Sequence, residues 1–123
     1  MNYSDLSDFQ INKLVAGALG IKVAENQFFY LGYRDESVVI VSRYSEADAV
    51  VDYCNNPSDA GPIILKNKIS INCYKEGDSD YWESSSYDSK NNEKKRHFAN
   101  DDKNPLRAAM IVYLMMKDAE NEV

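Results

Sequence analysis

The sequence predicts an α+β protein in which a small, mostly antiparallel sheet packs with an N-terminal helix, a short middle helix and a buried C-terminal helix. Three observations support this class. Apolar residues recur at helical spacing near the start of the chain, β-branched and aromatic residues alternate in its middle, and an unbroken apolar run lies near its end. The 123 residues, of which 44% are hydrophobic, suffice for one domain with its own core.

The first helix is expected over residues 8–19. Ser7 and Gln10 have the spacing of a capping box, in which each side chain accepts a bond from the other residue's backbone N–H. The following apolar residues recur every three or four positions, and Gly20 is a suitable stop. Beyond it the period changes to that of strands. Two or three short antiparallel strands are expected, at residues 21–23, 27–31 and 38–44.

A middle helix is expected to start at Asn56, because Asn is a favoured cap and Pro57 is tolerated in the first turn. Gly61 and Pro62 are unfavourable inside a helix, so this helix is expected to begin or kink near them. Residues 69–74 alternate in the manner of a further strand.

Residues 76–103 are rich in Ser, Asp, Asn and Lys, a composition that buries little apolar surface. Apart from a short strand near residues 80–84, we expect a long flexible loop here, within a single domain spanning residues 1–123. The only histidine, His97, would then be solvated rather than held for catalysis. The basic residues 94–96 are interpreted as part of the same solvated loop.

Asn104 and Pro105 repeat the pattern of a capped helix start, and this last helix is expected to end near Glu120. Residues 108–116 are apolar on every side, which places the helix at the centre of the fold or at the interface of a homo-oligomer. These nine residues are too few to cross a bilayer, which needs about 20. The acidic start of the chain lacks the apolar core of a secretion signal. We expect a cytoplasmic protein without a membrane segment.

The charge of the chain restricts its partners. A net charge of −6 and a pI of about 4.7 oppose direct binding to nucleic acid, which requires clustered Lys and Arg. A basic protein partner remains compatible with this charge. Cys54 and Cys73 lack the spacing of a zinc site, and no phosphate-binding or dinucleotide motif is present. We therefore expect no metal and no cofactor.

Arg107 is the strongest candidate for a binding residue. If Asn104 caps the last helix, Arg107 lies in its first turn, where a positive charge opposes the helix dipole by up to about 1 kcal/mol. A carboxylate of the chain, such as Asp101 or Asp102, would compensate this charge. Alternatively, the guanidinium holds an anionic ligand together with free backbone N–H groups. If the helix start at Asn56 converges with this one, the two would form an anion-binding corner.

Two further residues complete the candidate site. Trp82, beside Tyr81, would either stack on a base or peptide, or cover the edge of the core. Asp59 lies in the first turn expected for the middle helix. The candidate ligand-binding residues are therefore Asn56, Asp59, Trp82, Asn104 and Arg107.

Several blocks of the chain resemble, in the same order, the NinX-like family of small proteins from tailed phages and prophages. They are MNYSDLSDFQINKLVAGALG, DYCNNPSDAGPII, NKISI and NPLRAAMIVYLMM, and they cover roughly half of the chain. Gly61 stands where that family usually has a bulky residue, often Trp. The resemblance implies a small accessory protein encoded near phage replication and late-control genes, and it assigns no catalytic residues.

From these observations we expect a non-enzymatic accessory protein that binds and neutralises a host factor. That factor would be a small anionic nucleotide signal of host defence, or a host protein with a basic surface. One alternative is an accessory to phage DNA replication or recombination that acts through protein contacts. The other is an enzyme with a carboxylate site for Mg²⁺, because such sites leave little local spacing to recognise.

Overall fold

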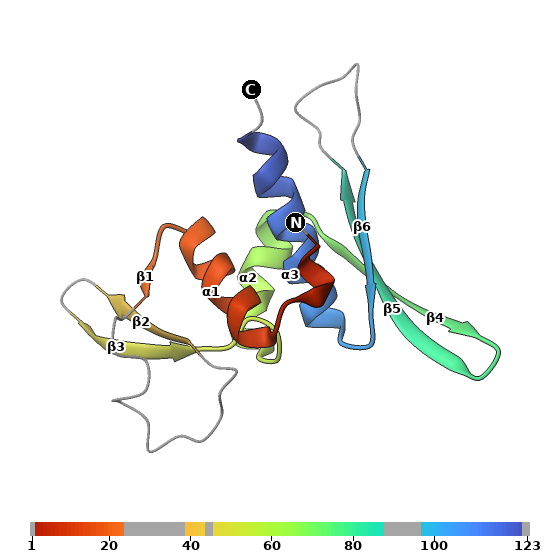
Figure 1. Ribbon diagram of the computed structural model, residues 1–123, viewed down its shortest axis with the longest axis horizontal. Coiled ribbons are helices and arrows are strands. Elements are labelled where there is room, and N and C mark those ends of the chain that lie inside the picture. Colours follow the sequence, from red (N-terminus) through yellow and green to blue (C-terminus); the bar gives the residue numbers. More distant parts are fainter. Residues whose placement is uncertain (1, 24–38, 44–45, 88–96, 122–123) are drawn as a thin grey trace.

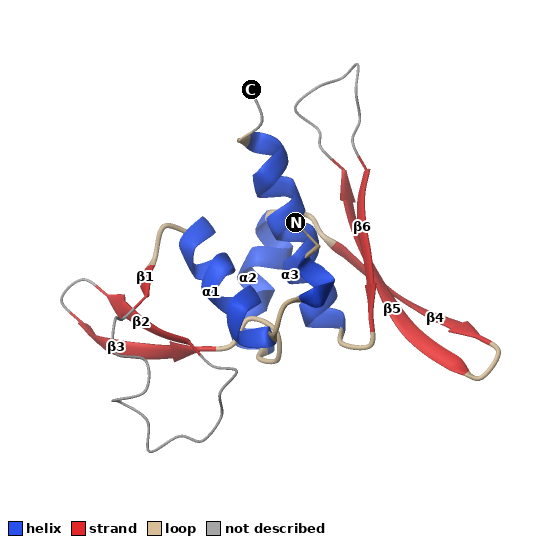
Figure 2. Cartoon of the chain, viewed as in Figure 1, coloured by secondary structure: helices blue, strands red, loops and turns tan. Residues whose placement is uncertain are grey.

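The computed structural model describes residues 2–23, 39–43, 46–87 and 97–121. In this part of the chain, three α-helices lie together at the centre, and two antiparallel sheets extend from them on opposite sides (Figures 1 and 2). The predicted α+β class is confirmed. The strands, however, are divided between two three-stranded sheets.

Helix α1 (Asp8–Ala18) follows a short 3-10 turn, η1 (Tyr3–Asp5). The predicted capping box is present: the Gln10 backbone N–H donates to Ser7 Oγ at 3.2 Å, and the Ser7 backbone N–H donates to Gln10 Oε1 at 2.9 Å. Gly20 then adopts a φ of 76°, a conformation that favours glycine and ends the helix. The start and stop signals in the sequence therefore place α1 correctly.

The first sheet contains β1 (Lys22–Val23), β2 (Val39–Arg43) and β3 (Glu46–Val51) in that order. β1 and β2 match the strands expected at residues 21–23 and 38–44. β3 was not predicted, because Glu46 and Asp48 interrupt its apolar residues and lower its apparent strand propensity. The strand expected at residues 27–31 lies outside the described residues.

The second sheet contains β4 (Ser70–Glu76), β5 (Ser79–Tyr87) and β6 (His97–Asp102), again in order. The short strand expected near residues 80–84 is part of β5. The long loop expected over the rest of 76–103 is wrong for most of the described residues there, and residues 88–96 lie outside the described part. The strands are polar because residues 72–80, at one end of the sheet, are exposed on both faces. At the other end of β5, residues 84–86 are small serines that lie in the core and form hydrogen bonds there, as Ser84 does with the carbonyl of Ser70 at 3.0 Å.

Helix α2 (Pro57–Lys66) starts after Asn56 as predicted and continues through Gly61 and Pro62. Helix α3 (Pro105–Glu120) also has its predicted bounds. Every residue from Ala108 to Leu114 is at most 4% exposed. Helix α3 is surrounded by α1, α2 and the second sheet (Figure 1). Its apolar residues are therefore buried by elements of the same chain, which is the first of the two placements expected from the sequence. No helix within the described ranges is long and apolar enough to span a membrane.

Candidate functional site

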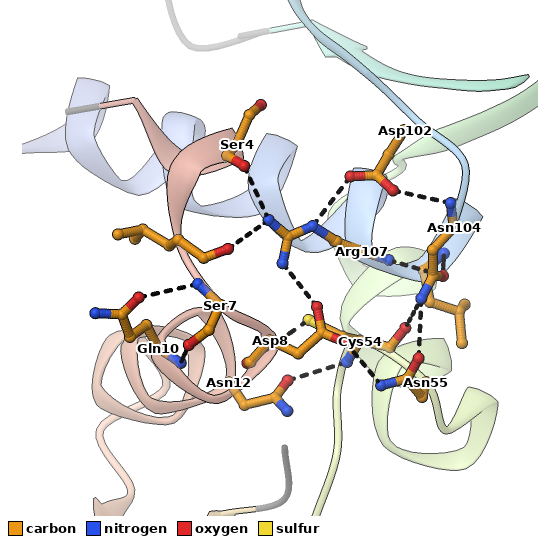
Figure 3. Close-up of polar contacts among 12 residues, drawn as sticks. Ser4, Ser7, Asp8, Gln10, Asn12, Cys54, Asn55, Asp102, Asn104 and Arg107 are labelled. Atoms are coloured by element: carbon orange, nitrogen blue, oxygen red, sulfur yellow. Dashed lines mark hydrogen bonds and ion pairs between the residues drawn. The ribbon is translucent and has the colours of Figure 1, made fainter. Parts of the chain in front are cut away.

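Arg107 lies in the first turn of α3 and points toward the N-terminal segment of the chain (Figure 3). Its Nη1 donates to Asp8 Oδ1 at 2.7 Å, and its Nε donates to Asp102 Oδ2 at 3.0 Å. Nη2 donates to the carbonyls of Leu6 at 2.6 Å and Ser4 at 3.2 Å. We call this arrangement the Arg107 clamp. It joins the N-terminal turn, α1, β6 and α3 at one point.

The clamp supplies the negative charge that the sequence required near Arg107. Asp102 was one of the predicted partners, whereas Asp8 was not, because it lies 99 positions away on another helix. The Arg107 side chain is only 12% exposed. An anionic ligand would have to displace Asp8 or Asp102 from it, so the contacts favour the internal carboxylates over the ligand.

The starts of α2 and α3 do converge, as the sequence suggested. Asn104 Oδ1 accepts bonds from the backbone N–H groups of Leu106 and Arg107, at 3.0 and 3.2 Å. Its Nδ2 donates to the Cys54 carbonyl at 2.7 Å and to Asn55 Oδ1 at 3.0 Å, in the turn before α2 (Figure 3). The side-chain amide of Asn104 therefore connects the two helix starts.

A buried asparagine extends this network into the core. Asn12 of α1 is fully buried; its Nδ2 donates to Asp52 Oδ1 at 2.9 Å, and its Oδ1 accepts the Cys54 N–H at 3.0 Å. Sequence periodicity gave no sign of this role, since a lone polar residue in an amphipathic helix is usually exposed. Asn12 fixes the turn before α2 against α1.

The thiol of Cys54 lies beside the clamp and is chemically protected. Burial, with the nearby Asp8 carboxylate as the next largest cause, raises its pKa to about 12, although Arg107 opposes the shift. A thiol with this pKa remains protonated at neutral pH and is a poor nucleophile or metal ligand. Cys73, by contrast, is exposed on β4.

The remaining predicted site residues are not members of the Arg107 clamp. The side chain of Asn56 caps α2 by accepting the Ser58 N–H at 2.9 Å, and Asp59 Oδ2 accepts the Asp52 N–H at 2.9 Å. Trp82 is half-buried on β5, paired in register with Asp102. Of the five candidates, the structure joins Asn104 directly to Arg107, whereas Asn56 and Asp59 bond to the first turn of α2 and the segment before it. Among the side chains placed by the structure, no three His, Cys, Asp or Glu residues gather as metal ligands.

A pocket of about 330 Å³ lies between the end of α1, the end of β3, and helices α2 and α3. Asp59 is the only predicted site residue that lines it. The other residues that line the pocket are Leu19, Ile21, Val51, Tyr53, Ser58, Pro62, Ile63, Lys66, Asn67, Tyr113 and Lys117. No residue of this pocket takes part in the Arg107 clamp.

The exposed face of the second sheet combines aromatic and acidic side chains. Tyr74 and Tyr81 are register partners, and their rings stack with centroids 5.6 Å apart at 16°. Strand alternation places Glu76, Glu83 and Asp101 on the same face. Desolvation raises the pKa of Tyr81, and these three carboxylates add to the shift. We call these five residues the acidic sheet face.

These features define a small α+β protein whose helix starts are fastened together by internal polar contacts. The chain belongs to the family described as Bacteriophage P22, NinX, whose sequence model matches residues 2–117. The resemblance found in the sequence is thus confirmed over nearly the whole chain. A comparison with curated proteins found no match.

Proposed function

We propose that this phage protein acts in the cytoplasm of the host cell by binding, and so neutralising, a basic host protein through its acidic sheet face. The observation that carries the proposal is the stacked pair of the exposed Tyr74 and the half-buried Tyr81, which lies among carboxylates on one face of the second sheet. The proposed mode of action is binding rather than catalysis.

The chemistry of the face suits a partner rich in Lys or Arg. A cationic side chain placed over the ring of Tyr74 or Tyr81 would gain a cation–π contact. Glu76, Glu83 and Asp101 would attract the same charge at longer range, in a chain whose net charge is −6. Tyrosines are also common anchors of protein interfaces, because they bury a large area at a low entropic cost.

The register of the sheet provides a further argument for a binding role. Glu83 and Asp101 are direct cross-strand partners, and like charges in that position destabilise a sheet. Residues that weaken a fold are expected where function requires them. A bound cationic partner would remove the repulsion between these two carboxylates.

Arg107 gives less support to a nucleotide-binding function, because its donors already contact Asp8, Asp102 and two carbonyls. An accessory role in phage replication would use the same acidic sheet face if the partner were a basic replication protein. The identity of the partner therefore distinguishes that alternative.

The proposal is tested by affinity recovery of the tagged full chain from the host bacterium, followed by direct binding measurements with the purified partner. We expect a partner whose contact surface is basic and whose affinity falls as salt rises. Replacing Glu83→Gln and Asp101→Asn together should weaken binding about tenfold, the loss typical of removing charge-assisted contacts.

The matched control neutralises two carboxylates away from this face, Asp5→Asn and Glu120→Gln, and should leave binding unchanged. If both double variants bind equally well, or if affinity does not depend on salt, the acidic sheet face is not the contact surface. Circular dichroism confirms that each variant is folded.

A further inference from the structure

We infer that the pocket between α1, α2 and α3 is a binding site for a small organic anion with an aromatic body, of the class of a nucleoside monophosphate. This inference is independent of the proposed function, since the pocket shares no residue with the acidic sheet face. It also uses none of the groups that form the Arg107 clamp.

The size and walls of the pocket fit a small molecule with a flat apolar part. Its volume of about 330 Å³ lies at the lower end of the range for small-molecule sites, roughly 300 to 1,000 Å³. Ile63 and Val51 are buried core residues that form part of its apolar wall. Tyr53 and Tyr113, both buried, also line the pocket, so the part of its wall that a flat ring would contact includes aromatic groups.

Two lysines give the pocket a charge opposite to that of the whole chain. Lys66 and Lys117 line it, against the single carboxylate of Asp59, in a protein with a net charge of −6. Each lysine lies in the last turn of its helix, where the helix dipole stabilises a cation. An anion entering the pocket would therefore meet two ammonium groups, of which that of Lys117 is already positioned by Glu120 and the Tyr113 ring.

The present partner of Lys117 does not prevent it from binding a ligand. Its Nζ lies 3.2 Å from Glu120 Oε2, in a partly exposed pair of a kind that contributes little to stability. The same Nζ lies 5.6 Å from the centre of the Tyr113 ring. A phosphate could take the place of Glu120 while the ammonium keeps its position over the ring.

Asp59 gives the pocket a hydrogen-bond acceptor that can select among ligands. One of its carboxylate oxygens accepts the Asp52 N–H at 2.9 Å, and Asp59 is among the residues that line the pocket. A carboxylate accepts further hydrogen bonds, so it favours a ligand that carries N–H donors on its ring. A nucleoside monophosphate combines all three properties, since its base supplies the ring and the donors and its phosphate supplies the charge.

Calorimetry with the full chain tests the inference, using AMP, GMP, CMP and UMP as probes. Three further compounds are measured separately. Adenosine tests the ring without the charge, inorganic phosphate tests the charge without the ring, and phenylpyruvate tests a different aromatic anion. We expect at least one monophosphate to bind at a single site and to raise the melting temperature, with adenosine and phosphate each about tenfold weaker. Tighter binding of phenylpyruvate would identify an aromatic carboxylate instead and overturn the assignment to nucleotides. No binding in any arm would overturn the site itself.

Substitutions locate the site on the molecule. Lys66→Gln and Lys117→Gln should each weaken the monophosphate about tenfold, as expected for the loss of one charge-assisted contact. The matched controls are Lys13→Gln and Lys75→Gln, which remove exposed lysines of α1 and β4 outside the pocket. Equal affinity in all four variants would place the ligand elsewhere. Because the pocket variants leave the acidic sheet face intact, they should recover a protein partner as the wild type does.

Discussion

Arg107 illustrates how a charge in an unfavourable position can organise its surroundings. In the first turn of α3 its guanidinium opposes the helix dipole. The unfavourable position is compensated by Asp8 and Asp102, and by carbonyls that would otherwise need other donors. Its planar fork reaches several groups at once, which the single ammonium of a lysine cannot do.

Replacing Arg107 should therefore destabilise the protein strongly. We expect Arg107→Ala to lower the free energy of unfolding by about 3 kcal/mol, because two partly buried carboxylates lose their cation. Arg107→Lys should recover only part of this loss. Urea denaturation measures both, with Lys13→Ala as an exposed control expected to stay within about 0.5 kcal/mol. A loss below 1 kcal/mol in Arg107→Ala would show that the clamp contributes little.

The two cysteines should differ sharply in reactivity. Iodoacetamide at pH 8 should modify Cys73 in the folded protein and leave Cys54 intact, because burial raises the Cys54 pKa to about 12. In urea both thiols should react. Mass spectrometry of the labelled peptides measures this, and equal labelling rates in the folded state would contradict the protected environment of Cys54.

At the scale of single residues, the sequence predicted that Arg107 needs a negatively charged partner, but it identified only one of the two carboxylates that serve as partners. Asp102 lies five positions from Arg107 and was among the residues considered, whereas Asp8 and the buried Asn12 depend on how α1 packs. Spacing along one chain carries no information about contacts between distant helices. Arg107 therefore stood out in the sequence, while most of its partners did not.

Among the elements, the two capped helices offer a direct comparison. Asn56 accepts one bond at the start of α2, whereas Asn104 accepts two bonds at the start of α3 and donates two to the turn before α2. The second asparagine therefore acts both as a cap and as a connection between helices.

Asn56→Ala should cost about 1 kcal/mol of unfolding free energy, the usual value of a lost cap. Asn104→Ala should cost about 2 to 3 kcal/mol, since it also removes the bonds to Cys54 and Asn55. Chemical denaturation of the two variants side by side tests the difference. Equal losses would mean that the connection between the helix starts is energetically neutral.

For the acidic sheet face we expect a substitution that stabilises the protein, in contrast to the losses of stability predicted for the helix caps. Glu83→Gln should raise the unfolding free energy by about 0.5 kcal/mol, because it removes the repulsion from the directly paired Asp101. Glu76→Gln is the matched control, since its register partner is Ser79. Thermal denaturation at low salt gives the clearest reading. A destabilised Glu83→Gln would show that this carboxylate serves the fold instead of a partner.

Helices were easier to predict than strands in this chain, for physical reasons. Caps and prolines mark the starts of α2 and α3 locally, so their bounds follow from a few neighbouring residues. β5 was predicted only near residues 80–84 and continues to Tyr87, because Ser84 and Ser86 are buried with their hydroxyls bonded to backbone carbonyls. The polar composition of this segment suggested a loop, because strands are usually recognised by their apolar residues. In the structure its buried side chains are serines, which are satisfied by hydrogen bonds instead of apolar contacts.

For the molecule as a whole, the first and last helical segments are joined directly. The Tyr3 hydroxyl donates to the Asp118 carboxylate, 115 positions away, and Tyr3 is only 8% exposed. Desolvation, followed by this hydrogen bond, raises the pKa of Tyr3 to about 12. The folded state thus holds the phenol proton more tightly than the unfolded chain, whose tyrosines titrate near pH 10.

Stability should accordingly depend on alkaline pH. The contribution of Tyr3 is fully present below pH 10 and is lost as the pH rises toward about 12, because the unfolded state ionises first. Urea denaturation at pH 8, 10 and 11 should show this loss, and Tyr3→Phe should reduce the slope. Cys54 produces a similar loss above pH 9, so the same series in Cys54→Ala separates the two. An unchanged slope in Tyr3→Phe would contradict the role of the phenol.

The Arg107 clamp also sets an order of events during synthesis. Asp8 leaves the ribosome early, but the guanidinium that binds it is 99 residues behind. Until β6 and the start of α3 have emerged, the carbonyls of Ser4 and Leu6 lack their donor. Contacts between residues so far apart in the sequence slow folding, because a long loop must close before they can stabilise the folded state. A nascent chain that ends before residue 107 therefore cannot fasten its own N-terminal segment.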